Sequence, residues 1–253
     1  MNKKTDDIDF YTEREKHRKE ILKYDQQNDS SIGTTLRQVV LGGQDGLVNV
    51  LGILLGVAVA TNDSKIVIIA GMAATFAESL SMAAVAYTST RATQDFYHAQ
   101  LKREKEEIEE IPHMEVQEIR EIYEKKGFRG RLLEDIVKHI TSDKVLWLRE
   151  MMREELNLTE SETVNPVKEA AVVGISAFAG SFIPLIPFFF LSAQSALVVS
   201  LLVSLAVLFG AGIIKARLTT GSQLKSGIEM LLIGGIAAIA GYAIGAIFKV
   251  SAG

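Results

Sequence analysis

The stretch from Ala193 to Ile214 reads AQSALVVSLLVSLAVLFGAGII and contains no charged side chain. An α-helix needs about 20 consecutive apolar residues to cross the hydrocarbon core of a bilayer, so this stretch is long enough to span a membrane. Four further stretches have the same character: Leu36–Ala60, Ile66–Ser89, Val167–Phe190 and Gly227–Phe248. The sequence therefore predicts an all-α integral membrane protein with five transmembrane helices.

The overall composition hides this pattern, because 48% apolar and 23% charged residues would also fit a soluble protein. The charges are segregated along the chain: 18 of the 31 acidic residues lie between Arg91 and Glu162, and residues 170–214 carry none. Residues 90–165 are therefore predicted to form a water-facing helical domain between the second and third spans. A polar N-terminal segment (1–35) precedes spans one and two (36–89), and spans three to five occupy residues 166–253.

Lys and Arg residues indicate the orientation, because cytosolic loops carry an excess of them. Seven lie in residues 1–35 and thirteen in residues 90–165, and the link between spans four and five adds Lys215, Arg217 and Lys225. We therefore expect the N-terminus and the 90–165 domain in the cytosol and the C-terminus outside. No targeting segment is recognisable and most loops are short, which favours a prokaryotic cell membrane.

Several function classes find no support in the sequence. The net charge is -4 and no basic stripe is present, which argues against nucleic acid as a partner. Cysteine is absent, so a thiolate metal site is impossible. The chain has no His-Glu-x-x-His motif, no phosphate-binding glycine loop and no nucleophile elbow. We expect neither an enzyme nor a tightly bound cofactor.

Within the 90–165 domain, the sequence predicts helices over 91–110, 115–126 and 131–140, and a last helix that reaches Leu156. Gly127 is expected as a left-handed C-cap, and Thr141, Ser142 or Asp143 as an N-cap. In the membrane spans, two Gly-x-x-x-Gly motifs permit close contact between helices, and they suggest a homodimer: Gly52 with Gly56, and Gly241 with Gly245.

The insert contains carboxylates at helix-face spacing. Side chains that share a face are Glu104 with Glu107, Glu115 with Glu118, and Met151 with Glu155. Three helices could bring these groups to one divalent cation, and a thioether would favour transition metals over Mg²⁺ or Ca²⁺. The alternative is that a run such as KREKEEIEE, residues 102–110, is only a solvated helix face with ion pairs between successive turns.

Two ionisable residues lie inside the predicted membrane spans. Asp45 lies in the first, in GGQDGLVN, and Glu78 lies in the second, with Met82 one turn further on. A charge at membrane depth costs at least ~2.5 kcal/mol, so such a residue usually faces a polar pathway or a partner. The alternatives are that Asp45 caps a kinked backbone, that Glu78 stays protonated against Ser79 or Ser81, and that Met82 serves packing.

Taken together, these motifs are similar to those of the vacuolar iron transporter family, which includes the yeast vacuolar iron and manganese transporter. The resemblance runs from Leu36 to Phe248. It rests on Gly42 and Asp45-Gly46-Leu47, on Ser81-Met82-Ala83, on the insert pattern of Glu104, Glu107, Pro112, Glu115, Glu118, Ile122-Tyr123, Gly127 and Met151-Met152-x-Glu154-Glu155-Leu156, and on Pro184-Leu185-Ile186-Pro187. The resemblance implies a homodimer with the ion path at the dimer interface and proton-coupled export of Fe²⁺ from the cytosol.

By position, the resemblance implies that Asp45 and Met82 line the membrane path. It implies a cytosolic metal site made of Glu104, Glu107, Glu115, Glu118, Met151 and Glu155. The glutamate assignment is not unique, because the same spacing recurs in Glu107, Glu110, Glu118 and Glu121. The first set is preferred because Glu115 and Glu118 follow Pro112 in a P-x-x-E-x-x-E pattern.

The chain departs from the family at Val85 and Ala86, where many members carry a Gly-Glu pair after Ser-Met-Ala. This departure puts in doubt a membrane carboxylate near the inner end of the second span, and Glu78 is a hypothetical substitute. We expect a proton-coupled antiporter that exports Fe²⁺, with Mn²⁺ as a second candidate, and serves iron homeostasis. The alternatives are a membrane-anchored ferroxidase and a metal-sensing adaptor, each using the insert.

Overall fold

The computed structural model describes residues 30–158, 165–218 and 221–249, and these residues form helices and short connections. The predicted N-terminal segment therefore lies outside the described residues up to position 29. The helices are α2 (Ser30–Thr61), α3 (Ser64–Glu110), α4 (Pro112–Lys125), α5 (Gly130–Thr141), α6 (Lys144–Glu150), α7 (Pro166–Leu185), α8 (Ala193–Leu218) and α9 (Gln223–Ile247). Among the described residues, five helices are long and apolar enough to cross a membrane: α2, α3, α7, α8 and α9. This confirms the predicted number of spans.

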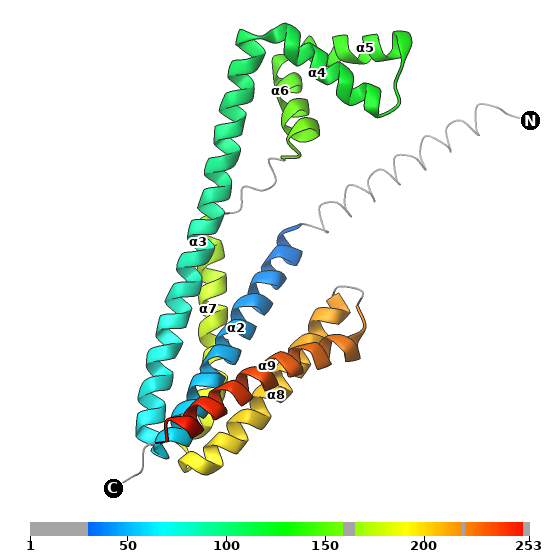
Figure 1. Cartoon of the computed structure of the whole chain (residues 1–253). Helices are drawn as coiled ribbons and strands as arrows, with labels where there is room; N and C mark the ends of the chain where they lie inside the picture. Colours follow the sequence, from blue (N-terminus) through cyan, green and yellow to red (C-terminus); the bar gives the residue numbers. More distant parts are fainter. Residues whose placement is uncertain (1–29, 159–164, 219–220, 250–253) are drawn as a thin grey trace, which may run out of the picture. The chain divides into compact units, whose positions relative to one another are not determined.

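The chain divides into two compact units, and α3 and α7 contribute residues to both. The first, the membrane unit, comprises residues 1–83 and 171–253. The second, the insert, comprises residues 84–170. In the membrane unit, α8 and α9 lie side by side and α2 packs against both (Figure 1). Its main core gathers Val50 and Leu54 of α2 with Val67, Leu185 and Phe188.

The two Gly-x-x-x-Gly motifs pack against each other within the chain. A Cβ atom built on Gly241 would lie 2.1 Å from the carbonyl oxygen of Gly52, and one on Gly245 would lie 2.2 Å from that of Gly56. Small residues at such positions let two backbones approach closely, so that van der Waals contact holds the helices together. The motifs thus join α2 to α9, and their spacing alone does not indicate a second copy. The homodimer stays a prediction.

The prolines of the third span change its geometry where they occur. Pro184 lies buried in the last turn of α7, and a 3₁₀ turn, η3 (Ile186–Phe189), contains Pro187. Proline removes a backbone donor and disfavours the α conformation of the preceding residue. The Ser200 hydroxyl of α8 donates to the carbonyl of Pro184 over 2.6 Å. This bond satisfies a backbone carbonyl where α7 gives way to the 3₁₀ turn.

The insert has its own hydrophobic core beneath α3, α4, α5 and α6. The core consists of Ile108, Ile119, Leu133, Val137, Ile140, Trp147 and Met151. Gly127 has φ of 99°, and the amide of Phe128 donates to the carbonyl of Tyr123, which confirms the left-handed cap at the end of α4. Asp143 is the N-cap of α6, because its carboxylate accepts from the amides of Val145 and Leu146.

The last helix of the insert differs from the expected continuous α-helix. After α6, residues Met151–Glu155 form a π-helical turn, η1, and the amide of Leu156 donates to the carbonyl of Met151. A π-turn holds one more residue per turn than an α-helix and is frequent at functional sites. Side-chain bonds hold it in place: Tyr123 donates to Glu150 over 2.9 Å, and Lys126 pairs with Glu154.

We expect Gly241→Ala to destabilise the membrane unit and Gly235→Ala to leave it intact. Both glycines lie in α9, but a Cβ on Gly235 has no atom within 4 Å, whereas one on Gly241 would overlap the α2 backbone. The overlap should cost about 1–3 kcal/mol. Thermal unfolding in detergent measures the difference, and equal melting temperatures would contradict the close α2–α9 contact.

Candidate functional site

Two buried glutamates stand at the centre of the predicted metal site. Glu104 of α3 is 2% exposed and Glu115 of α4 is 3% exposed. Each precedes by one turn a core isoleucine of its own helix, Ile108 and Ile119, so the helix face that fills the core also brings the carboxyl inward. One oxygen of each carboxyl, Oε2, is buried and has no hydrogen-bond partner in the described part of the chain. Such groups usually have partners, so these two call for an explanation.

Further carboxylates surround this buried pair. Burial, and next the charges of Glu155, Glu107 and Glu115, together raise the pKa of Glu104 to about 7. Burial also raises the pKa of Glu115 to about 7, helped by Glu118, Glu107 and Glu155. The structure thus brings the five predicted glutamates within electrostatic reach of one another's neighbours in the set. We call them the carboxylate cluster: Glu104, Glu107, Glu115, Glu118 and Glu155.

The competing set of glutamates has different surroundings. Glu110 and Glu121 are exposed, and Glu121 accepts a hydrogen bond from Gln117 on its own helix. Neither is among the groups that most affect the pKa of Glu104 or Glu115. Burial therefore separates two sets that spacing alone leaves equivalent.

The carboxylates of the cluster are not close enough together to coordinate one metal ion as they stand. Among the described residues, no group of three or more His, Asp or Glu side chains is placed to hold one metal ion. Met151 is fully buried and packs in the insert core, where its sulfur contributes to packing. On its exposed side, the cluster is met by Arg103, whose Nε donates to Glu107 Oε1 over 3.0 Å. Binding of an ion would require the carboxylates to draw in and Glu107 to change partner.

A second polar group lies in the membrane unit, between α2 and α3. The amide nitrogen of Asn49 donates to Glu78 Oε1 over 3.1 Å, and the carboxyls of Asp45 and Glu78 interact directly. Asp45 and Asn49 are one turn apart on α2, and Met82 is one turn beyond Glu78 on α3. The structure thus brings Asp45 and Glu78 together. Sequence reasoning missed Asn49, although its place four residues after Asp45 in an apolar run was a signal.

Glycines beside Asp45 fix this part of α2. A Cβ on Gly46 would lie 2.3 Å from the carbonyl oxygen of Ala177, and one on Gly42 would lie 2.6 Å from that of Val173. These contacts press α7 against α2 on the turns that flank Asp45, whereas Asp45 itself is only half-buried. The carboxyl is therefore held by a rigid helix pair, and its side chain stays accessible.

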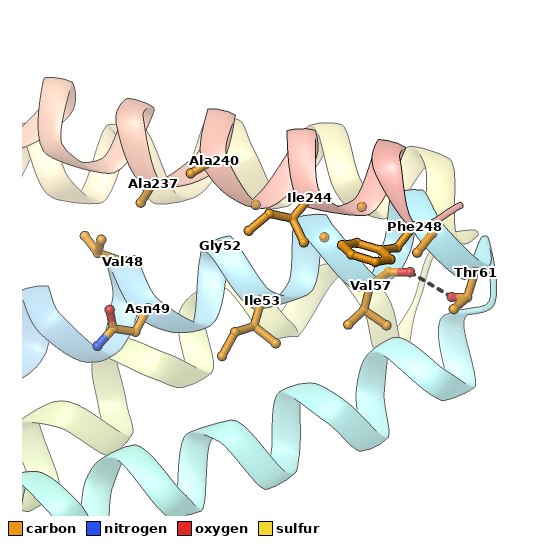
Figure 2. A pocket seen from close by; sticks show the side chains of 14 residues that line it. Val48, Asn49, Gly52, Ile53, Val57, Thr61, Ala237, Ala240, Ile244 and Phe248 are labelled. Carbon is orange, nitrogen blue, oxygen red and sulfur yellow. Dashed lines mark hydrogen bonds between the residues drawn. The ribbon is translucent and has the colours of Figure 1, made fainter. Parts of the chain in front are cut away.

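From Asn49, a groove of about 560 Å³ runs along α2 and α9. Figure 2 shows the Asn49 amide at one end and Thr61 at the other, with Ile53, Val57 and Ile244 between them. The Thr61 hydroxyl donates to the carbonyl of Val57, so it is satisfied within its own helix. The groove is thus apolar except where it meets the polar group at Asn49.

The raised pKa values predict how insert stability depends on pH without metal. Glu104 and Glu115 have an ordinary pKa of 4.5 and a folded pKa of about 7, so the stability linked to their protonation is lost as pH rises from 5 to 8. We expect a loss on the order of 2 kcal/mol. Trp147 is the chain's single tryptophan and lies in the insert core, so its fluorescence reports urea unfolding of the insert.

Two comparisons sharpen this test. Replacing both residues by glutamine should flatten the pH dependence of the unfolding midpoint, and Mn²⁺ should raise the midpoint of the unchanged protein at pH 8. A midpoint that is constant or increases from pH 5 to pH 8 would contradict the burial of ionisable, unpaired carboxyls.

Comparison with known proteins extends the sequence resemblance. Residues 36–246 match the VIT family. Vacuolar iron transporter 1 of Oryza sativa subsp. japonica is 32% identical over 211 residues, which cover 83% of this chain and 84% of that protein. Vacuolar iron transporter 1 of Tulipa gesneriana is 30% identical over 209 residues, covering 82% and 85%. Protein CCC1 of Saccharomyces cerevisiae is 26% identical over 212 residues, covering 80% and 66%.

These relatives come from plants and a yeast, so they give no support to the expected prokaryotic cell membrane. The predicted sides of the two termini likewise find no support in them. The match itself spans the helices of both units, from the first span to the last. The chain belongs to the VIT family.

Proposed function

We propose that this multi-pass membrane protein exports Fe²⁺, and also Mn²⁺, from the cytosol in exchange for protons. Relatives named as vacuolar iron transporters cover most of the chain and support metal transport. In this proposal the metal ion is the transported substrate. The insert faces the cytosol, captures the ion and passes it to the membrane path.

The observation that carries the proposal is the pair of unpaired carboxylate oxygens on Glu104 and Glu115. A buried carboxylate without a partner is unfavourable, and the negative charges of nearby glutamates increase the cost. A divalent cation would satisfy both oxygens and neutralise their charges. Fe²⁺ and Mn²⁺ accept carboxylate ligands, so the chemistry of the cluster fits this cargo.

In the membrane path, Asp45 and Glu78 supply the exchange step. When no metal is present, a carboxyl pair can hold a proton taken from the outer side. When a cation binds from the cytosol, the pair can release that proton to the cytosol. Met82, one turn beyond Glu78 and half-buried, would offer a thioether that favours a transition metal over Mg²⁺ or Ca²⁺. Glu78 would thus stand in for the carboxylate that the chain lacks at Ala86.

The exposure of this polar group favours the homodimer. Asn49 is exposed and Asp45 and Glu78 are only half-buried in the single chain, yet all three lie within membrane-spanning helices. Polar side chains at this depth normally face a partner or a water-filled path and not lipid. We propose that a second copy covers the group, with the N-terminus in the cytosol and the C-terminus outside.

Metal binding by the insert should depend on Glu104 and not on Glu110. Glu104→Gln removes a charge from the buried pair, and we expect the affinity for Mn²⁺ to fall by at least about ten-fold, or ~1.4 kcal/mol. Glu110→Gln is the matched control on the same helix, and it should leave the affinity unchanged. Calorimetric titration of the full-length protein in detergent measures both, and similar losses in the two variants would remove the basis for the cluster.

Transport should depend on Asp45. In proteoliposomes with a pH gradient, we expect Asp45→Asn to reduce Fe²⁺ and Mn²⁺ uptake to near the level of empty liposomes. The variant should still bind Mn²⁺ at the insert. Uptake equal to that of the unchanged protein would overturn the path, and oxygen consumption with Fe²⁺ in place of flux would favour the ferroxidase alternative.

A further inference from the structure

We propose that Asn49 is a positioning residue of the membrane path, which holds the Glu78 carboxyl toward Asp45. This inference rests on the proposed function, because it assigns Asn49 a part in the same path. The role concerns how Glu78 is oriented, and it differs from contributing a charge.

The geometry supports this role in three ways. The Asn49 Nδ2 group donates across two helices, from α2 to Glu78 Oε1 on α3, over 3.1 Å. The bond uses only one oxygen of the carboxyl, so Oε2 stays outside it. Asn49 also lies one turn from Asp45 on α2, and Asp45 interacts with the same Glu78 carboxyl. The amide that bonds Glu78 therefore comes from the helix turn next to Asp45.

An amide is suited to this position where an ionised donor would not be. Lysine or arginine would satisfy Glu78 but would add a positive charge beside the path, which would repel a divalent cation. Asparagine donates without charge, and its carbonyl oxygen remains an acceptor. A hydrogen bond between two membrane helices stabilises the side-chain conformation that makes it.

The turns of α2 that follow Asn49 offer no further side-chain donor, because residues 50–60 are all apolar or glycine. Beyond Asn49 the groove is lined by Gly52, Ile53 and Gly56, which offer no side-chain donor (Figure 2). Among the described residues, the uncharged side chain that donates a hydrogen bond to Glu78 is that of Asn49. Without it, no described side chain of α2 donates to the Glu78 carboxyl, and its orientation toward Asp45 is less restricted.

A double-mutant cycle in proteoliposomes tests the role. Asn49→Leu is similar in volume but lacks the donor, and we expect it to lower the Mn²⁺ uptake rate about ten-fold, with the insert's Mn²⁺ affinity unchanged. In a Glu78→Gln background, the same substitution should have little further effect, because Asn49 acts through the Glu78 carboxylate. Asn49→Gln keeps the amide and should recover part of the rate.

Thr61→Val is the matched control, since Thr61 lies at the other end of the same groove and donates only to its own helix. It should transport as the unchanged protein does. Asn49→Val replaces Asn49→Leu if the leucine variant does not give monodisperse protein. Unchanged uptake in folded Asn49→Leu or Asn49→Val would overturn the inference, and so would an equal fold-loss with and without the Glu78 carboxylate.

The Asp45→Asn variant separates this inference from the proposed function. If Asp45→Asn transports normally, the path through Asp45 is wrong and Asn49 has no path to serve. If Asp45→Asn loses transport while Asn49→Leu keeps it, only the role of Asn49 is wrong.

Discussion

Carboxyl groups that are removed from water without a partner are the constraint on which this structure depends. In the insert, Glu104 and Glu115 are both buried, and each leaves an oxygen unsatisfied. The pKa of both rises to about 7, because burial and neighbouring glutamates disfavour the charged form. In the membrane unit, Asp45 and Glu78 interact, and among the described side chains Asn49 is the donor to Glu78. Both places hold more acceptors than donors, and a divalent cation is the ligand that would correct this imbalance.

The surrounding fold holds these groups on rigid elements. In the membrane unit, glycines allow α2 to contact α7 and α9 at backbone distance, so the turn that carries Asp45 is fixed. In the insert, the core isoleucines anchor α3 and α4, and the bond from Tyr123 to Glu150 fixes the start of the π-turn that carries Glu155. A site that must release its ion benefits from this combination, because the helices stay in place while the ends of long glutamate side chains move.

The sequence predicted the parts of the fold that local chemistry decides. The five spans follow from apolar length, and Asp143 could be named as one of three possible caps because its side chain accepts from the next turn. It could not show that Glu104 is buried and Glu110 exposed, since both obey the same spacing and the difference depends on where α4 folds back. The sequence also could not predict that Gly241 contacts Gly52, because small-residue spacing predicts a close contact but not the helix that makes it. The bond from Asn49 to Glu78 could not be predicted for the same reason, because the two residues lie 29 positions apart on different helices.

The most direct test of this account is the location of bound Mn²⁺ in a crystal of the full-length protein, determined from the anomalous scattering of manganese. The account predicts a manganese peak between the carboxyls of Glu104 and Glu115, and its loss in the Glu104→Gln variant. A peak only at exposed glutamates such as Glu110 and Glu121, or no peak in the insert at all, would contradict the claim that these buried, unpaired carboxyls form the capture site.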